Sequence, residues 1–309
     1  MRQEVESSAR GAWSVVGGVG LGRFLSERPE RVVLYGAGSE PWRNALGPGS
    51  DVWNGVAGVN EVVLAEGLPD LLRAGWAGGR QSIVIPLRRP AMQAMPPFYW
   101  SLAPTRRAHD TCDDKRRFAR FMAAAGLADL MPRSWEDKGD CRFPCLVKRN
   151  NRSGSDGVAI VNSPAELEAV MAVPPFRRRP VMFQELVDGL VDHATHTVAV
   201  AGRIVWHTSY AYDIDPATRL QTSAVHATRR RIGTPPAVLA QFERVLAALR
   251  YDGPASFDWR PRGSGFVLFE VNPRFGGSMM LPINRDDLRA GVSAVLAHAR
   301  PPGWLGRRS

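Results

Sequence analysis

Two acidic residues and an asparagine near the carboxyl end of the chain have the types and spacing of a divalent-cation site. The segment "ASFDWRPRGSGFVLFEVNPRFGGS" (255–278) places apolar strands on either side of "PRGSG", which predicts a β-hairpin with its turn near residue 264. Antiparallel partners then sum to about 528, so Asp258 should lie opposite Glu270, with Asn272 on the same face. Facing like charges repel, but Mg²⁺, with Mn²⁺ as an alternative, would bind both carboxylates and the amide oxygen. A solvated sheet face, with Asp258 paired to an arginine, is the competing interpretation.

Lysine is rare in this chain, because 40 residues are Lys or Arg and only Lys115, Lys138 and Lys148 are lysine. An ammonium is a compact charge on a slim stem, so a retained lysine indicates a narrow anion site. Lys148 precedes the segment "RSGSDG", whose small residues would let backbone N–H groups approach a phosphate closely. These small residues are Gly154, Ser155 and Gly157. Taken alone, such a loop is more often a turn, and three lysines can be accidental.

Hydrophobic periodicity and capping residues predict the elements that would position these side chains. A helix over 111–126 places Lys115 in its first turn, where a cation is unfavourable unless an anion lies nearby. The remaining elements are strands at 144–149, 157–162 and 181–189, a helix at 163–172 capped by Ser163, a hairpin over 194–212 turning at 201–203, and a helix over 234–250.

The amino-terminal third of the chain predicts a small Rossmann-like α/β layer. Short apolar strands are expected at 31–38, 59–67 and 82–87, with a helix at 68–75. The glycines at 15–25 do not fit G-x-G-x-x-G, so they give little support for a nicotinamide site. The segment 88–107, rich in proline and aromatic residues, is expected to be a domain boundary.

The order of these features along residues 111–280 resembles the ATP-grasp superfamily. "DDKRRFARFMAAAGLADLMP" is similar to the segment before the nucleotide site, and "FPCLVKRNNRSGSDGV" is similar to the second lysine with its phosphate loop. The resemblance implies an α/β protein of the α+β ATP-grasp type. Its expected domains are an amino-terminal α/β domain at 1–110, a central lobe at 111–185 and a carboxyl-terminal lobe at 186–309, with ATP between the last two.

The resemblance also implies a role for each candidate residue. Lys115, Lys148 and the glycine-rich loop would hold the phosphates of ATP. The adenine edge would meet Glu185, Leu186 and Val187 mostly through backbone groups, and either Asp192 or His193 would lie near the ribose. The magnesium ligands would be Asp258, Glu270 and Asn272, and the catalytic residue would be Arg274.

Arg274 resembles the arginine of the Asn-Pro-Arg sequence in the carbamoyl-phosphate synthetase and biotin carboxylase branch. That branch often has a second arginine two residues before the hairpin aspartate, where this chain has Ser256. The second arginine is therefore not identified, although the arginine-rich segment 219–231 could supply it.

The function implied by the resemblance is a carboxylate–amine ligase. Such an enzyme activates a small-molecule acid, for example an amino acid or peptide, as an acylphosphate, and an amine then attacks to give an amide, ADP and phosphate. The alternatives are an ATP-grasp carboxylase or phosphotransferase that makes no amide, and a nucleotide-binding protein without turnover.

Composition limits the remaining function classes. The net charge of +10 calls for an anionic partner, yet no nucleic-acid-binding signature accompanies the scattered arginines, so nucleic acid is an unlikely partner. Cys112, Cys141 and Cys145 fit neither a disulfide framework nor a zinc site, which indicates reduced thiols. No apolar run approaches the roughly 18 residues of a membrane span, and no signal peptide is evident. We therefore expect a cytoplasmic enzyme without a membrane partner, and a homodimer remains open.

Overall fold

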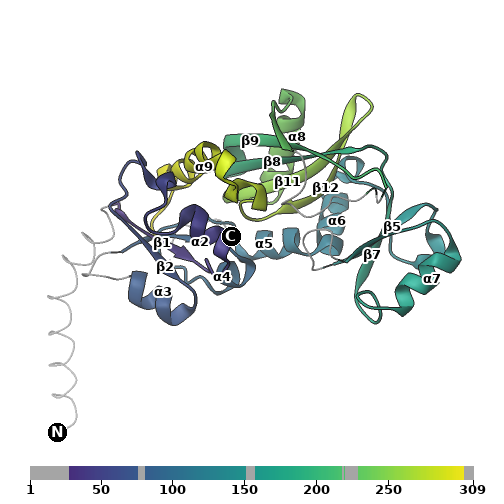
Figure 1. Cartoon of the computed structure of the whole chain (residues 1–309), viewed down its shortest axis with the longest axis horizontal. Coiled ribbons are helices and arrows are strands. Elements are labelled where there is room, and N and C mark those ends of the chain that lie inside the picture. Colours follow the sequence, from purple (N-terminus) through teal and green to yellow (C-terminus); the bar gives the residue numbers. More distant parts are fainter. Residues whose placement is uncertain (1–27, 76–80, 151–156, 218, 220–228, 303–309) are drawn as a thin grey trace, which may run out of the picture. The chain divides into compact units, whose positions relative to one another are not determined.

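A computed structural model describes residues 28–75, 81–150, 157–217, 219 and 229–302 (Figure 1). Contacts group the described residues into two units, one comprising residues up to Leu102 together with those from Val295 onward, and the other running from Ala103 to Ala294. The predicted division at 110 and 185 stays a prediction. Gly154 and Ser155 lie outside the described residues.

The first unit is built around a parallel sheet of order β2-β1-β3, which is the predicted α/β layer. Its strands are β1 (Arg31–Tyr35), β2 (Glu61–Ala65) and β3 (Ile83–Pro86), and its helices are α2 (Glu40–Leu46), α3 (Leu68–Gly75) and α4 (Arg89–Ala94), with a 3-10 turn at Asp51–Trp53. Val33 and Val84 are buried with Leu71 of α3, so burial of apolar side chains against the sheet holds this layer together.

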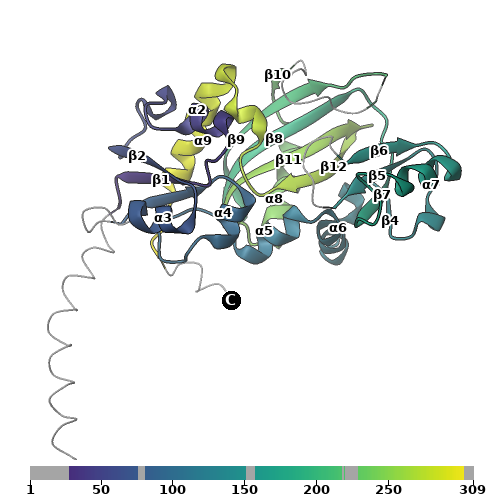
Figure 2. The same cartoon turned by 60° about the horizontal axis from the view of Figure 1, so that its bottom comes forward.

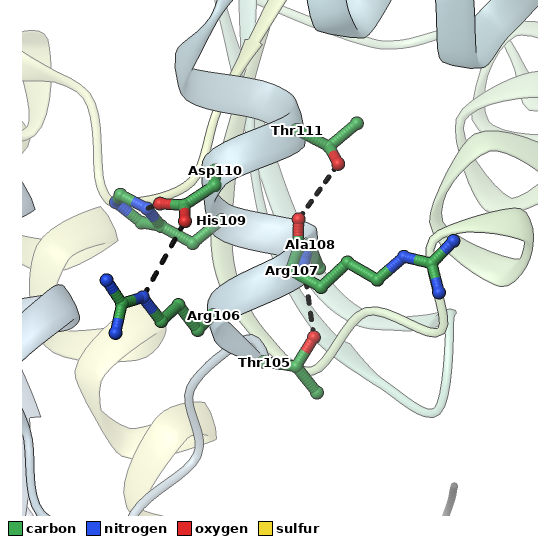
Figure 3. Close-up of polar contacts among 7 residues, drawn as sticks. All are labelled: Thr105, Arg106, Arg107, Ala108, His109, Asp110 and Thr111. Carbon is green, nitrogen blue, oxygen red and sulfur yellow. Dashed lines mark hydrogen bonds and ion pairs between the residues drawn. The ribbon is translucent and has the colours of Figure 1, made fainter.

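The second unit begins with two helices, α5 (Arg106–Asp113) and α6 (Lys115–Ala124). Helix α5 was not predicted, because it is mostly polar; Thr105 begins it by accepting a hydrogen bond from the Ala108 N–H at 3.2 Å (Figure 3). Asp114 ends α5 and caps α6, where its carboxylate accepts from the Arg117 N–H at 2.9 Å. The predicted helix is therefore shorter than expected, because 111–113 belong to α5, and Lys115 is the first residue of α6.

A four-stranded antiparallel sheet of order β4-β7-β5-β6 follows in the chain (Figure 2). Its elements are β4 (Ser134–Trp135), β5 (Cys145–Arg149), β6 (Val158–Val161), α7 (Pro164–Ala172) and β7 (Val181–Glu185), with 3-10 turns at Ala128–Leu130 and Lys138–Asp140. Ser163 caps α7 as predicted, accepting from the Glu166 N–H at 3.2 Å. Strand β7 is shorter than predicted and stops at Glu185, so residues 186–189 form a connection.

A five-stranded antiparallel sheet of order β10-β9-β8-β11-β12 completes the unit. Its elements are β8 (Val191–Val200), β9 (Arg203–Asp213), β10 (Arg229–Ile232), α8 (Pro236–Ala248), β11 (Gly253–Arg262), β12 (Gly265–Asn272) and α9 (Arg285–Ala297), with 3-10 turns at Gly277–Met280 and Pro282–Asn284. The β8–β9 turn is at Ala201 and Gly202, both with positive φ, as predicted.

One face of this larger sheet packs on helices and forms the main core. Phe242 of α8 stacks on Phe257 with ring centroids 4.1 Å apart, and Phe118 and Met122 of α6 join the same cluster. Side chains alternate along a strand, so the neighbours of Phe257 point to the opposite face. That opposite face carries Asp258.

Candidate active site

The hairpin of β11 and β12 places Asp258 directly opposite Glu270, as predicted. The route to this register differs from the prediction in one respect. The turn is the pair Gly263–Ser264, and a β-bulge leaves Phe269 of β12 without a partner between Glu270 and Leu268. Leu268 and Val271 are both buried in the core, so Phe269 and Glu270 both leave it for the site face.

The three predicted metal ligands converge. The Asn272 amide nitrogen donates to Asp258 Oδ2 at 3.0 Å and to Glu270 Oε1 at 3.4 Å. Burial, followed by the neighbouring Glu270 charge, raises the pKa of Asp258 well above its ordinary value. Burial alone would raise the pKa of Glu270 too, but Lys115 and Lys148 outweigh it and hold that pKa below the ordinary value. The two buried carboxylates therefore repel each other, and the charges of Lys115 and Lys148 favour the ionised form of Glu270.

Of the two predicted phosphate lysines, Lys115 contacts this carboxylate cluster, and Lys148 lies near enough for its charge to lower the pKa of Glu270. Lys115 Nζ lies 2.6 Å from Glu270 Oε2, and the two side chains are 14% and 19% exposed. Lys148 Nζ donates to Gln184 Oε1 at 2.6 Å and lies 5.2 Å from the centre of the Phe269 ring. Burial lowers the pKa of Lys148 to about 8. Lys115 lies at the start of α6, where a cation is unfavourable, and in this structure the Glu270 carboxylate is the anion that offsets its charge.

Gly157 lies where the described chain resumes after the glycine-rich segment. Its φ of +87° is accessible to glycine, and a Cβ there would approach the Arg149 side chain to 3.0–3.2 Å. Its carbonyl accepts from the Arg149 N–H at 2.9 Å, which closes the base of the loop. A contact of Gly157 with phosphate stays a prediction.

The residues after β7 already have partners within the chain. The Glu185 N–H donates to the Arg133 carbonyl at 2.8 Å, and the Glu185 carboxylate accepts from Arg262 at 2.6 Å. The Val187 carbonyl accepts from Arg260 Nη1, while Leu186 between them is half-buried. The predicted adenine-binding segment is thus positioned by arginines of β11.

Asp192 and His193 point to opposite faces of the large sheet. Asp192 Oδ1 accepts from Arg260 Nε at 2.8 Å on the face that carries Asp258. His193 pairs with Trp259 in the register and packs edge-on against its ring at 4.3 Å, on the helix-covered face. Of these two candidates, only Asp192 shares a face with the carboxylate cluster.

Arg274 follows β12 in a short connection, and His196 binds two residues that come after it. The Arg274 N–H donates to the Asn272 carbonyl at 2.8 Å, and its positive charge lowers the pKa of Asp258 against the larger effect of burial. Two residues on, the Gly276 N–H donates to His196 Nδ1 at 3.3 Å, so His196 Nε2 carries the proton and donates to Ser278 Oγ at 2.7 Å. Burial lowers the pKa of His196 to about 3.

Three arginines in the described part of 219–231 form ion pairs with aspartates. Arg219 pairs with Asp188 at 2.5 Å and Arg230 with Asp213 at 2.9 Å. Arg231 pairs with Asp287 at 2.8 Å, and Tyr210, directly opposite Arg231 in the register, donates to the same carboxylate at 2.5 Å. Tyr210 faces Ala194, which faces Asp258, so Arg231 belongs to the row of the acid site.

Sequence reasoning did not single out three residues that the structure places at this site. Gln184 binds Lys148, and the Phe269 ring lies close to both Lys148 and Arg260. Arg260 binds the Val187 carbonyl after β7 and the Asp192 carboxylate in β8. Within the described residues, no group of three or more His, Cys, Asp or Glu side chains is arranged to hold a metal ion. The predicted magnesium set of Asp258, Glu270 and Asn272 contains two such residues and stays a prediction. No helix in the described part of the chain has the length and apolar character to cross a membrane.

Comparison with known proteins identifies the fold. No protein-family model matches the chain, and no curated protein matches its sequence. D-alanine–D-alanine ligase from Bacillus anthracis, complexed with ATP, is similar in structure at 16% identity and a TM-score of 0.58, covering 88% of this chain and 95% of that one. L-amino acid ligase from Bacillus licheniformis is similar at 16% identity and a TM-score of 0.55, covering 89% of this chain and 76% of that one.

A carboxylase is also similar in structure. Biotin carboxylase from Campylobacter jejuni, complexed with β,γ-ATP, matches at 11% identity and a TM-score of 0.54, covering 88% of this chain and 73% of that one. These solved structures are ATP-grasp ligases, so the chain has the α+β ATP-grasp fold predicted from its sequence. At such low identities the likeness establishes the fold and not the reaction.

Proposed function

We propose that this chain is an ATP- and Mg²⁺-dependent ligase that joins a small-molecule carboxylate to an amine. The acid would be activated as an acylphosphate, and the products would be an amide, ADP and phosphate. The observation that carries this proposal is the 2.6 Å contact of Lys115 with Glu270, beside Asp258 and Asn272, in a chain of ATP-grasp fold. Cationic side chains on the phosphates and acidic ligands for the metal recur together in enzymes that transfer phosphoryl groups from a magnesium nucleotide.

The donor set suits magnesium. Two carboxylates and an amide are hard oxygen ligands, and Mg²⁺ commonly takes one or two carboxylates and completes its shell with water and phosphate oxygens. Burial and the Glu270 charge raise the pKa of Asp258, so its ionised form is unfavourable there, and a bound metal cation would offset this cost. Asn272 would have to rotate its amide, since its nitrogen now faces the carboxylates. When bound, magnesium would offset negative charge on the phosphates.

Cationic side chains of the protein would neutralise the remaining negative charge of the substrates. Lys115 and Lys148 would hold the phosphates, which requires Lys115 to exchange Glu270 for a phosphate oxygen. Arg274 would stabilise charge that develops on the reacting carboxyl and phosphoryl oxygens. We assign the second arginine to Arg231, because it shares the Asp258 row and pairs with Asp287, whose other carboxylate oxygen accepts from the Tyr210 hydroxyl. An oriented guanidinium binds a carboxylate with two parallel hydrogen bonds.

The nucleoside would contact the segment after β7. Leu186 and the remaining backbone groups of Glu185 and Val187 would meet the adenine edge. Asp192 is the ribose candidate, since His193 points to the helix-covered face. The substrates would be amino acids or peptide-like acids and amines.

ADP release measured across a panel of carboxylates and amines, with the Glu270→Gln variant as control, tests this proposal. We expect release that needs both an acid and an amine in the wild type, and almost none in the variant, because the charge of a metal ligand is lost. ADP release that depends on bicarbonate alone, or that persists in the variant, would replace the amide-ligase assignment with the carboxylase or phosphotransferase alternative.

A further inference from the structure

Arg260 is a buried arginine that binds one group in the connection after β7 and another at the start of β8. Its Nε donates to Asp192 Oδ1 at 2.8 Å, and its Nη1 donates to the Val187 carbonyl. The Arg260 side chain is 8% exposed and that of Asp192 is 19% exposed. One planar guanidinium therefore fixes the position of a backbone carbonyl and of a carboxylate at the same time.

The surroundings of Arg260 are shaped to hold it there. Its guanidinium lies 5.3 Å from the centre of the Phe269 ring, the residue that the β-bulge turns toward the site. Gly189 has a φ of +129°, and a Cβ at that position would approach Arg260 Cδ to 2.9 Å. The chain thus passes close over the arginine stem at Gly189, between the two groups that Arg260 binds.

Asp192 keeps one carboxylate oxygen for another partner. Its Oδ1 is bound by Arg260, and no hydrogen bond to its Oδ2 occurs among the residues that the structure describes. Because Arg260 neutralises and orients this carboxylate, Oδ2 can accept a hydrogen bond without adding an unpaired negative charge beside Asp258. A neutral hydroxyl is the donor that such an oxygen suits.

We infer that Arg260 is a positioning residue that sets selectivity for a ribonucleotide, by orienting Asp192 toward the sugar hydroxyls. This inference rests on the proposed function, because it requires a nucleotide beside Asp192. The competing role for Arg260 is purely structural. A structural residue would support the binding of every nucleotide equally, whereas a positioning residue would affect only nucleotides whose sugar hydroxyls bind Asp192.

Isothermal titration calorimetry of the full chain with Mg²⁺ and either ATP or 2′,3′-dideoxyATP separates these roles. The variants are Arg260→Met, which keeps the apolar stem but removes the donors, and Asp192→Asn. Arg230→Met is the matched control, because it also breaks an Arg–Asp pair, at 2.9 Å, but an exposed one in a row on the opposite face of the sheet. Thermal melting without nucleotide shows that each variant is folded.

We expect the wild type to prefer ATP by about tenfold or more, as for a hydrogen bond to a charged acceptor. Arg260→Met should remove most of that preference, while its affinity for dideoxyATP changes by less than about threefold. The double variant with Arg260→Met and Asp192→Asn should lose no more of the preference for ATP than Asp192→Asn alone. Arg230→Met should keep the preference. An equal loss of affinity for both nucleotides in Arg260→Met, or an unchanged ratio, overturns the inference. A wild type that binds neither nucleotide refutes the proposed function itself, whereas binding of ATP without a preference refutes only the role of Arg260.

Discussion

The buried pair Lys115–Glu270 and the exposed pair Lys138–Glu168 allow a matched comparison of interaction energies. Both join a lysine to a glutamate, at 2.6 Å and 2.5 Å, but their side chains are 14% and 19% exposed in the first pair and 51% and 63% exposed in the second. Water screens the exposed pair and also competes for its charges. The two pairs therefore have nearly the same N–O distance and differ mainly in how far their side chains are buried.

Double-mutant cycles with Lys→Met and Glu→Gln at each pair should give different coupling energies. For the buried pair we expect about 2 kcal/mol or more, because removing one partner leaves the other charge poorly solvated. For the exposed pair we expect about 0.5 kcal/mol or less. The coupling is measured as the free energy of unfolding in urea, followed by tryptophan fluorescence of the full chain.

The pH dependence of the buried coupling follows from the lowered pKa of Glu270. The unfolded carboxyl titrates near its ordinary pKa of about 4.3, so the stabilisation should be complete above that pH and lost as pH falls through the lower, folded pKa. Equal coupling energies for the two pairs would refute the reasoning, since they would show that Lys115 and Glu270 do not meet in a buried site.

Three further predictions concern Lys148 and His196. Lys148→Arg should weaken ATP binding about tenfold in calorimetry, because a branched guanidinium replaces a slim ammonium, whereas exposed Lys138→Arg should change it less than about twofold. Burial lowers the pKa of Lys148 to about 8, so ATP affinity should fall as pH rises from about 7 to about 9, and Lys148→Met should show no such fall. Neutral, buried His196 should cost the fold about 2 kcal/mol between about pH 7 and pH 5, as the unfolded imidazole gains a proton that the folded one, with a pKa of about 3, does not. His196→Gln should lack that loss when urea unfolding is measured at both pH values.

The acid hairpin could be predicted because alternation along a strand and pairing across a short turn depend on residue spacing alone. The pairing of Asp258 with Glu270 is correct, although the turn lies slightly earlier than predicted and the bulge at Phe269 compensates for the difference. The bulge itself could not be predicted. Nothing in "GFVLFEVN" distinguishes a regular strand from one in which two neighbouring residues leave the core.

Contacts between distant segments were beyond sequence reasoning. Arg260 is one of many arginines, and its burial depends on how β11 lies beside the segment that contains Val187 and Asp192. The choice between Asp192 and His193 likewise depends on the register of β8 with β11, which pairs His193 with Trp259. Register between strands far apart in sequence is set by packing of the whole sheet, so no local pattern reveals it.

Hydroxylamine trapping tests the central claim most directly, namely that a carboxylate is activated as an acylphosphate. With ATP, Mg²⁺ and an acid that supports ADP release, hydroxylamine should replace the amine and give a hydroxamate, which is measured with ferric iron. Arg274→Ala should reduce the rate of hydroxamate formation by about a hundredfold or more while ATP affinity changes little, as for a contact made mainly in the transition state. ADP release without any hydroxamate, or an Arg274→Ala variant that forms it at the wild-type rate, would contradict the account.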